Sequence, residues 1–134
     1  PKMNLIPASL VQAGEKESVV RLDNGKQLVL PISTPRNAEG QSVNLGIRPE
    51  HILWGNIEQS QYQANVMFVE HMGNETYLYL DNGNASEPWV VRNAERSPIS
   101  AGQTVGVQLP VEHCYLFDGD GNAFTRLVQT QNKH

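Results

Sequence analysis

Apolar and polar residues alternate with a period of two along much of the chain. In residues 42–47 and 104–109, Val, Leu or Ile occupies every second position, which is typical of half-buried β-strands. A longer strand is expected to carry four residues on one face: Tyr62, Ala64, Val66 and Phe68. The pattern therefore predicts short strands, each with one face turned to a core.

Turn signals join these segments into hairpins. Asp23-Asn24-Gly25 separates residues 18–22 from 26–30 and supplies residue types that tolerate the positive φ of a tight turn. Met72-Gly73-Asn74-Glu75 separates the long strand from residues 76–80 in the same way. Two β-hairpins are predicted.

Long helices are not expected. No window of 11 residues keeps helical apolar spacing without an interrupting Pro or Gly, and the chain contains 8 Pro and 11 Gly. Short strands separated by these residues predict an all-β fold, either a barrel or a sandwich of the small Greek-key kind.

The same sequence features occur twice. Residues 40–43 and Glu50-His51 return 62 positions later as residues 102–105 and Glu112-His113, and the Leu-Asp-Asn-Gly of residues 22–25 returns at 80–83. We predict a single domain, 1–134, with an internal repeat of approximately 4–54 and 60–117. The second copy needs four extra residues, and residues 84–101 are predicted to form a lengthened loop because they are rich in Asn, Ser, Pro and Ala.

Composition narrows the possible functions. The single cysteine, Cys114, excludes a disulfide framework, and with four scattered histidines it cannot supply a structural zinc site, so no metal is expected. The net charge of −4 and the lack of any Lys/Arg cluster argue against nucleic acid as a partner. The sequence has no long apolar run and no leader segment, so we expect no direct membrane insertion and a cytoplasmic location. The start at Pro1 suggests a piece of a longer protein.

Candidate chemistry is weak. Glu50-His51 and Glu112-His113 could be acid/base pairs, but adjacent residues of an extended strand point to opposite faces, so structural corners are favoured. Residues 118–122 imitate the start of a calcium loop, yet Ala123 and Gln129 occupy positions that need Gly and Glu, so a plain Asx turn is favoured. Phosphate-loop, dinucleotide, zincin and nucleophile-elbow motifs are missing from the sequence, so no catalytic residue is assigned and an autonomous enzyme is not expected.

Specific motifs resemble a known family. Leu45–His51 reads L-G-I-R-P-E-H, as in the C-terminal regulatory domain of the ATP-hydrolysing subunits of sugar-importing ABC transporters. Residues 69–76 are similar to the V-E-x-x-G-N-E-T hairpin of that family, and residues 114–117 to its C-x-L-F. Residues 1–4 look like the start of that domain. Within the family, the chain is most like the maltose/maltodextrin subunits.

The resemblance implies an OB-fold-like Greek-key β-barrel built from two related transport-associated (TOBE/MOP-like) units. Such a domain regulates and does not hydrolyse ATP; ATP and Mg would be bound by a nucleotide-binding domain that these 134 residues lack. The implied parent is cytoplasmic and peripheral to the inner membrane.

The implied partners are a second copy in a homodimer, a glucose-specific phosphotransferase regulatory protein, a transcriptional activator and, through the parent, permease subunits. Ala64, where relatives often carry Gly, and residues 84–88 depart from the family pattern, which bears on partner binding. The expected partner and regulatory surface consists of Gly40, Gly46, Arg48, Glu50, His51, Glu70, Gly73 and Asn74.

An alternative of a different class stays open. Related transport-associated domains bind molybdate-type anions, so a small-ligand or oxyanion sensor is the second hypothesis. Titration with sugars and oxyanions, followed through Trp54 and Trp89, would separate a sensor from a docking module.

Overall fold

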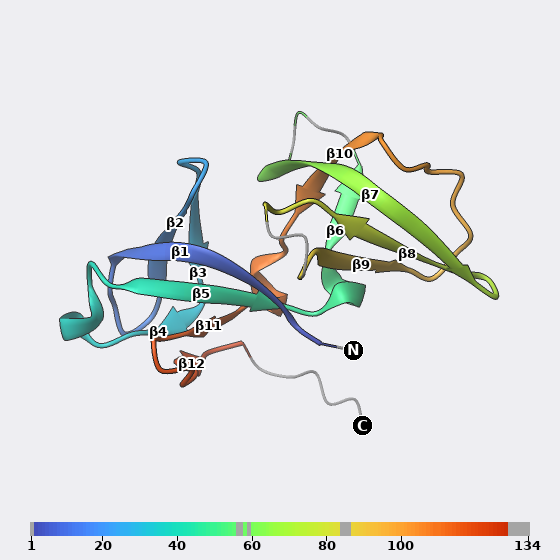
Figure 1. Ribbon diagram of the computed structural model, residues 1–134. Coiled ribbons are helices and arrows are strands. Elements are labelled where there is room, and N and C mark those ends of the chain that lie inside the picture. Colours follow the sequence, from blue (N-terminus) through green and yellow to red (C-terminus); the bar gives the residue numbers. More distant parts are fainter. Residues whose placement is uncertain (1, 56–57, 59, 84–86, 129–134) are drawn as a thin grey trace, which may run out of the picture. The chain divides into compact units, whose positions relative to one another are not determined.

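The computed structural model describes residues 2–55, 58, 60–83 and 87–128 (Figure 1). None of these residues lies in an α-helix, and the predicted all-β fold class is confirmed. Short 3-10 helices separate some of the strands. In chain order the elements are β1 (Asn4–Gln12), β2 (Ser18–Leu22), β3 (Gln27–Leu30), β4 (Ile32–Ser33), η1 (Arg36–Ala38), β5 (Ser42–Ile47), η2 (Pro49–His51), β6 (Leu53–Gly55), β7 (Tyr62–Met72), β8 (Glu75–Leu80), β9 (Trp89–Asn93), β10 (Thr104–Gln108), η4 (Val111–His113), β11 (Tyr115–Phe117) and β12 (Thr125–Arg126).

The chain divides into two compact units. Unit 1 comprises Pro1–Leu5 and Ile47–His113, and unit 2 comprises Ile6–Gly46 and Cys114–His134. Each unit is built on one five-stranded sheet, in the order β6-β10-β7-β8-β9 for unit 1 and β11-β5-β1-β2-β3 for unit 2. Read in parallel, the two orders match strand for strand.

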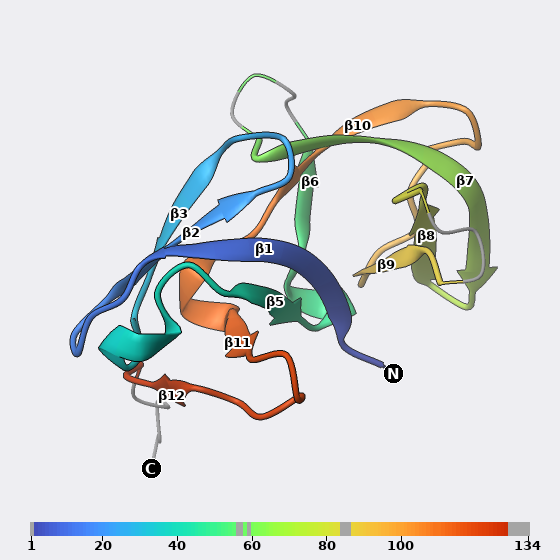
Figure 2. The same cartoon turned by 60° about the vertical axis from the view of Figure 1, so that its left-hand side comes forward.

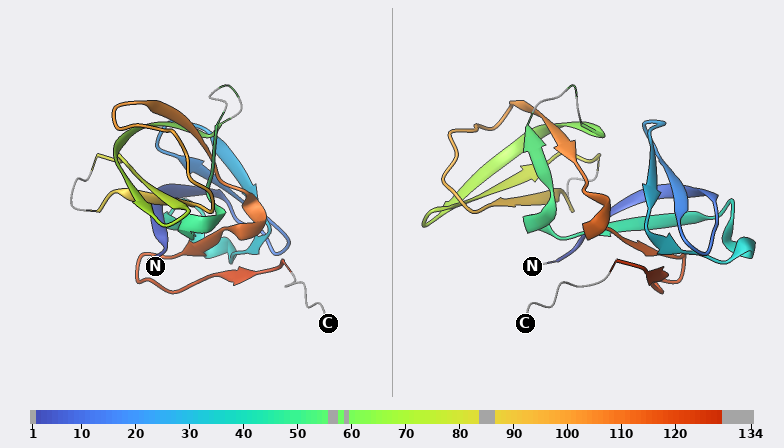
Figure 3. Two further views of the ribbon diagram at one scale, coloured as in Figure 1. Left: turned by 90° about the vertical axis from the view of Figure 1, so that its right-hand side faces the viewer. Right: turned by 180° about the vertical axis from the view of Figure 1, so that it is seen from behind.

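One strand of each sheet comes from the other part of the sequence. β6 follows β5 along the chain but pairs with β10, and β11 follows β10 but pairs with β5. Figure 3 shows β6 beside β10 and β11 beside β5. The two predicted copies therefore exchange their last strands, which the linear repeat did not reveal. The copy boundaries themselves stay a prediction.

The two predicted hairpins are confirmed. β2 pairs with β3 and β7 with β8, both antiparallel. Gly25 at φ 91° closes the first hairpin, where the N–H of Leu22 donates to the Lys26 carbonyl at 2.8 Å. Gly73 at φ 65° begins the second turn, a two-residue loop between Met72 and Glu75. Glycine is suited to both positions because the left-handed region costs it no steric clash.

A β-bulge corrects the prediction for the long strand. The register of β7 against β8 shifts between Val66 and Phe68. One extra residue reverses which face the following side chains occupy, so Ala64 and Val66 are buried as predicted while Phe68 is 48% exposed. The prediction that Phe68 shares their face is wrong. β1 carries a similar shift between Leu10 and Gln12, and both strands bend visibly in Figure 2.

The predicted loop over residues 84–101 is wrong in part. β9, Trp89–Asn93, lies inside it and pairs with β8 along five residues. Val91 is fully buried and Trp89 only 8% exposed, so this stretch closes the sheet of unit 1. Residues 84–86 lie outside the described residues. The polar residues on either side concealed this short strand, although Trp and Val are typical strand residues.

Each unit has its own apolar core. In unit 2 the core is formed by side chains from all five strands of the sheet, whereas in unit 1 it is formed by side chains from β7, β8, β9 and β10, because β6 has no buried residue. Fully buried side chains include Ile6, Leu10, Val20, Leu30, Leu45 and Leu116 in unit 2, and Ile47, Leu78, Leu80 and Val91 in unit 1.

Candidate regulatory surface and cleft

The β7–β8 hairpin carries three of the predicted site residues. Glu70 is exposed on β7, and the hydroxyl of Tyr79 on β8 donates to its Oε1 at 2.9 Å. Phe68 stacks on the Tyr79 ring with centroids 4.2 Å apart and an interplanar angle of 14°. Burial raises the pKa of Tyr79, and the hydrogen bond to Glu70 adds to the effect. These contacts restrain the exposed Glu70 side chain on the part of β7 that follows the bulge.

Gly73 and Asn74 form the tip of the hairpin. Both are exposed, and Arg96 Nη1 donates to the Gly73 carbonyl at 3.1 Å. The Arg96 contact ties the tip to the segment after β9. The tip is therefore accessible and fixed, which suits a contact surface for a protein because little ordering is needed on binding.

An ion pair joins the inner part of this hairpin to β9. Arg92 donates from Nη2 and Nε to Glu75 Oε2, at 2.7 and 3.2 Å. The Arg92 hydrogen bond lowers the pKa of Glu75. Burial, followed by the negative charge of Glu75, raises the pKa of Tyr77, whose hydroxyl donates to Glu75 Oε1 at 3.2 Å. Sequence reasoning did not select Glu75 or Arg92, because only the β8–β9 register brings them together.

The two Glu-His sequences lie in 3-10 helices, so the assumption of extended strands is wrong. Pro49 opens η2, and the His51 N–H donates to the Arg48 carbonyl at 3.0 Å; in η4 the His113 N–H donates to the Pro110 carbonyl at the same distance. Proline fits the first position of such a turn because it has no N–H to satisfy. The corner role predicted for these sequences agrees with this geometry.

The turns bring two histidines together within unit 1. The rings of His51 and His113 stack with centroids 3.9 Å apart and an interplanar angle of 13°. Arg48 and Glu50, which flank this corner, are exposed. Three predicted site residues therefore gather at one corner.

Gly40 and Gly46 lie in unit 2. Gly40 is exposed at φ 90°, and its N–H donates to the Leu10 carbonyl at 2.7 Å. Gly46 is buried in β5 opposite Tyr115 of β11. Gly40 is therefore accessible at the surface, whereas Gly46 is enclosed within the packing of β5.

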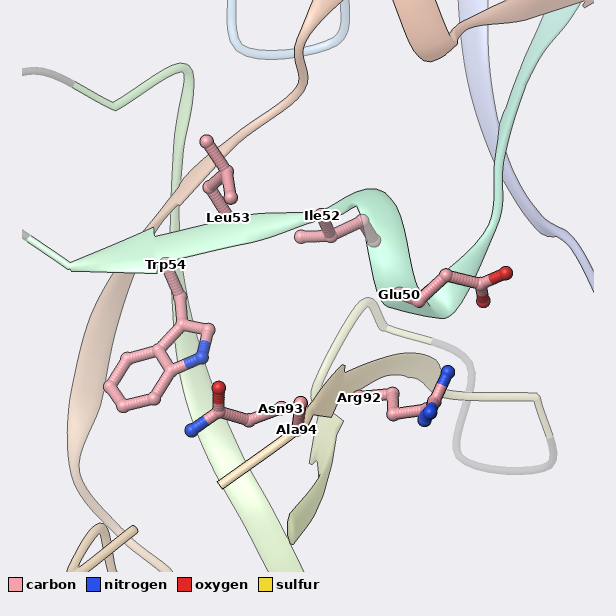
Figure 4. A pocket seen from close by; sticks show the side chains of 7 residues that line it. All are labelled: Glu50, Ile52, Leu53, Trp54, Arg92, Asn93 and Ala94. Atoms are coloured by element: carbon pink, nitrogen blue, oxygen red, sulfur yellow. The ribbon is translucent and has the colours of Figure 1, made fainter. Parts of the chain in front are cut away.

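Unit 1 also contains an open cleft of about 420 Å³ (Figure 4). It lies between η2 and β6 on one side and the end of β9 on the other, where Ile52 is buried at the base. Figure 4 shows the Trp54 indole beside the Asn93 carboxamide, with Glu50 and Arg92 at the other end of the cleft. Sequence analysis did not select Trp54 or Asn93 as site residues. Aligning the repeat would have marked Trp54, because the second copy has Leu116 at that position.

The calcium-like segment of unit 2 is an Asx turn, as predicted. Asp118 Oδ1 accepts from the N–H groups of Asp120 and Asn122, both at 2.9 Å. Gly121 adopts φ 86°. Within the residues that the structure describes, no group of three or more His, Cys, Asp or Glu side chains is arranged to hold a metal ion.

Comparison with known families identifies the chain's class. The sequence profile of the TOBE domain matches residues 45–117, and the chain belongs to the TOBE domain family. The profile of the MalK OB fold domain matches residues 1–52. The fold class expected from the resemblance, OB-type and all-β, is confirmed.

Individual proteins with similar sequences define the branch of the family more closely. The chain is 34% identical over 129 residues to the maltose/maltodextrin import ATP-binding protein MalK of Salmonella typhi, covering 96% of this chain and 35% of that protein. It is 32% identical over 128 residues to MalK of Vibrio cholerae, with 95% and 34% covered. The chain thus spans about a third of the length of these relatives, and the resemblance drawn from its motifs is confirmed.

A solved structure supports the fold independently. The cytoplasmic molybdate-binding protein ModG, with molybdate bound, superposes with a TM-score of 0.64 at 12% identity, covering 84% of this chain and 94% of ModG. At that identity the likeness concerns the fold alone. In the described part of the chain, no helix has the length and apolar character needed to cross a membrane.

Proposed function

We propose that the chain is the regulatory and dimerisation domain of the ATP-binding subunit of an ABC importer for maltose/maltodextrin or a similar sugar. The observation that carries the proposal is the similarity to MalK proteins along 96% of the chain, together with the two family profiles. The role is non-catalytic: ATP and Mg bind in another domain of the parent, which couples this domain to the permease subunits. The parent acts in the cytoplasm, peripheral to the inner membrane.

The proposed partner surface in unit 1 has two parts. One is the hairpin with Glu70, Gly73 and Asn74, and the other is the η2 corner with Arg48, Glu50 and His51. Both are held by short hydrogen-bonded turns, so binding a protein requires little ordering of the chain. In the proposal, this surface receives a second copy of the domain, the unphosphorylated glucose-specific phosphotransferase protein and a transcriptional activator.

The test measures association directly. Sedimentation of the chain gives its oligomeric state, and calorimetric titration with the phosphotransferase protein gives its affinity. Glu70→Ala combined with Asn74→Ala is expected to weaken partner binding about tenfold, equivalent to roughly 1.4 kcal/mol. Glu95→Ala, an exposed carboxylate outside the proposed surface, is the control. A chain that stays monomeric and binds no candidate partner contradicts the proposal.

A further inference from the structure

The cleft of unit 1 contains polar groups that the fold does not use. Among the described residues, no hydrogen bond engages the indole N–H of Trp54, the carboxamide of Asn93 or the carboxylate of Glu50. Trp54 and Asn93 are half-buried, and Glu50 is exposed. Each group therefore keeps its donors or acceptors available to a ligand.

The charges in the cleft argue against an anion. Arg92 is already paired with Glu75 at 2.7 Å, and Glu50 adds a second carboxylate close enough to raise the pKa of Arg92 further. With two carboxylates for one guanidinium, the local charge is negative. An oxyanion would need uncommitted cations or a nest of N–H donors. The oxyanion alternative therefore finds no support in this cleft.

The remaining chemistry fits a neutral molecule with many hydroxyl groups. An indole presents a negative face to the weakly positive C–H groups of a sugar ring. The Asn93 carboxamide can donate to one hydroxyl and accept from its neighbour, while the Trp54 N–H donates to a third. A volume of about 420 Å³ lies within the usual range for ligand clefts, roughly 300–1,000 Å³.

Unit 2 shows that the cleft is a departure from the shared plan. Trp54 of β6 pairs with Val107, and at the equivalent position of unit 2 Leu116 of β11 pairs with Leu45. Leu116 is fully buried and carries a hydrogen bond on its carbonyl from the Phe124 N–H at 2.8 Å, so the following segment covers β11. At the matching place, unit 1 exposes an aromatic ring beside an unengaged amide.

We propose that the cleft between β6 and β9 binds a neutral sugar, with Trp54 as the stacking platform and Asn93 as the hydroxyl-recognising group. The site is open and has few contacts, so we expect a dissociation constant on the order of 1 mM. This inference goes beyond the docking role, and its failure would leave that role untouched because the docking test relies on the β7–β8 hairpin.

The test uses the two tryptophan indole N–H signals in a proton–nitrogen NMR spectrum of the chain, titrated with glucose and maltose to about 50 mM, roughly fifty times the expected dissociation constant. The Trp54 signal is expected to shift saturably. Trp89 serves as the internal reference, because its indole N–H donates to the Leu5 carbonyl at 3.2 Å and its signal should stay in place.

Two variants probe the site. Trp54→Leu installs the residue found at the matching position of unit 2, and Asn93→Ala removes the amide; each is expected to weaken sugar binding at least about tenfold. The matched control is Asn44→Ala, since Asn44 is a half-buried amide that lines a cleft of about 360 Å³ in unit 2 without an aromatic residue. It should bind sugar as the parent chain does.

Several results would overturn the proposal. The first is a Trp54 signal that does not move with either sugar. The second is sugar binding, followed through backbone signals, that is as strong in Trp54→Leu as in the parent chain. The third is a loss of sugar affinity in Asn44→Ala equal to the loss in Asn93→Ala. If the Trp54 signal shifts with molybdate, sulfate or a quaternary ammonium ion but not with sugars, the cleft binds an ion and the sugar proposal is wrong.

Discussion

The two units share a strand order but treat their exchanged edge strand differently. In unit 2, β11 places Leu116 in the core, where it is 0% exposed. An isolated bridge between Phe117 and Ala123 shows the chain doubling back along this strand. In unit 1, β6 places Trp54 half-exposed beside a cleft.

The comparison separates what a topology fixes from what it leaves free. Strand order and register recur because backbone pairing and a buried apolar face specify them. The side chain at one edge position is under no such constraint, because an edge strand has a neighbour on one side alone. The same strand arrangement can therefore carry a buried apolar side chain or a half-exposed aromatic side chain at this edge position.

The largest expected effect tests this difference at the matching positions. Leu116→Ala should lower the free energy of unfolding by about 2–5 kcal/mol, since it leaves a cavity in a filled core. Trp54→Leu should cost roughly 1 kcal/mol or less, because the indole is only half-buried. Urea unfolding measures both. Equal costs would mean that Trp54 is a core residue, and the contrast between the units would fail.

The second prediction concerns buried hydroxyls at matching strand starts. Ser18 donates to the Ile32 carbonyl at 2.7 Å and lies 2.7 Å from the Thr34 hydroxyl. Thr76 accepts from the Ser97 N–H at 3.0 Å and lies 3.3 Å from Nδ1 of the exposed His71. Ser18→Ala removes two short, buried hydrogen bonds, whereas one of the two bonds of Thr76 is longer and reaches an exposed side chain, so Ser18→Ala should cost about 1–3 kcal/mol and exceed Thr76→Val.

Urea unfolding of Ser18→Ala and Thr76→Val gives the two values. Thr104→Val serves as the control because its hydroxyl bond to Asn65 is exposed, and it should change stability by less than about 0.5 kcal/mol. A reversed order, with Thr76→Val the more damaging, would show that unit 1 depends more on its hydroxyl than the lengths and burial of these bonds indicate.

The third prediction concerns the edge of β9. The Asn4 carboxamide accepts from the Val90 N–H at 2.7 Å and donates to the Val90 carbonyl at 2.8 Å, as a paired strand would. Asn4→Ala should cost about 1–2 kcal/mol and speed hydrogen exchange at Val90. Asn4→Asp keeps the acceptor but loses the donor, so an intermediate effect is expected. Unchanged exchange at Val90 in both variants would mean that the side chain does not secure this edge.

The smallest expected effect is a pH dependence specific to unit 1. The pKa of Glu75 is lowered from its ordinary value of 4.5, mainly by the hydrogen bond from Arg92. The folded state thus binds this proton less readily than the unfolded state, so the stabilisation is present above pH 4.5 and is lost as the pH falls through the lowered pKa.

Urea midpoints from neutral to acidic pH provide the measurement. Glu75→Gln should flatten the acid side of the profile, whereas Glu95→Gln, outside the ion pair, should leave its slope nearly unchanged. An identical slope in Glu75→Gln and the parent chain would show that the pair with Arg92 adds nothing to stability.

Local patterns predicted much of the fold because their causes are local. The Asp23-Asn24-Gly25 and Gly73-Asn74 turns were found from residues that tolerate positive φ, and strand β5 from its alternation. The bulge near Phe68 was missed, because a one-residue register shift leaves no trace in composition. β9 was missed because the polar residues around Trp89, Val90 and Val91 dominate the composition of residues 84–101.

Short-range periodicity, turn chemistry and motif identity predicted the all-β class, the hairpins, the family and the candidate residues from Arg48 to Asn74, because these signals lie in neighbouring residues. The exchange of β6 and β11, the stacking of His51 on His113 and the presence of Trp54 and Asn93 in one cleft emerge from the three-dimensional fold. These depend on pairing between residues far apart along the chain, where each contact is favourable only once the others have formed.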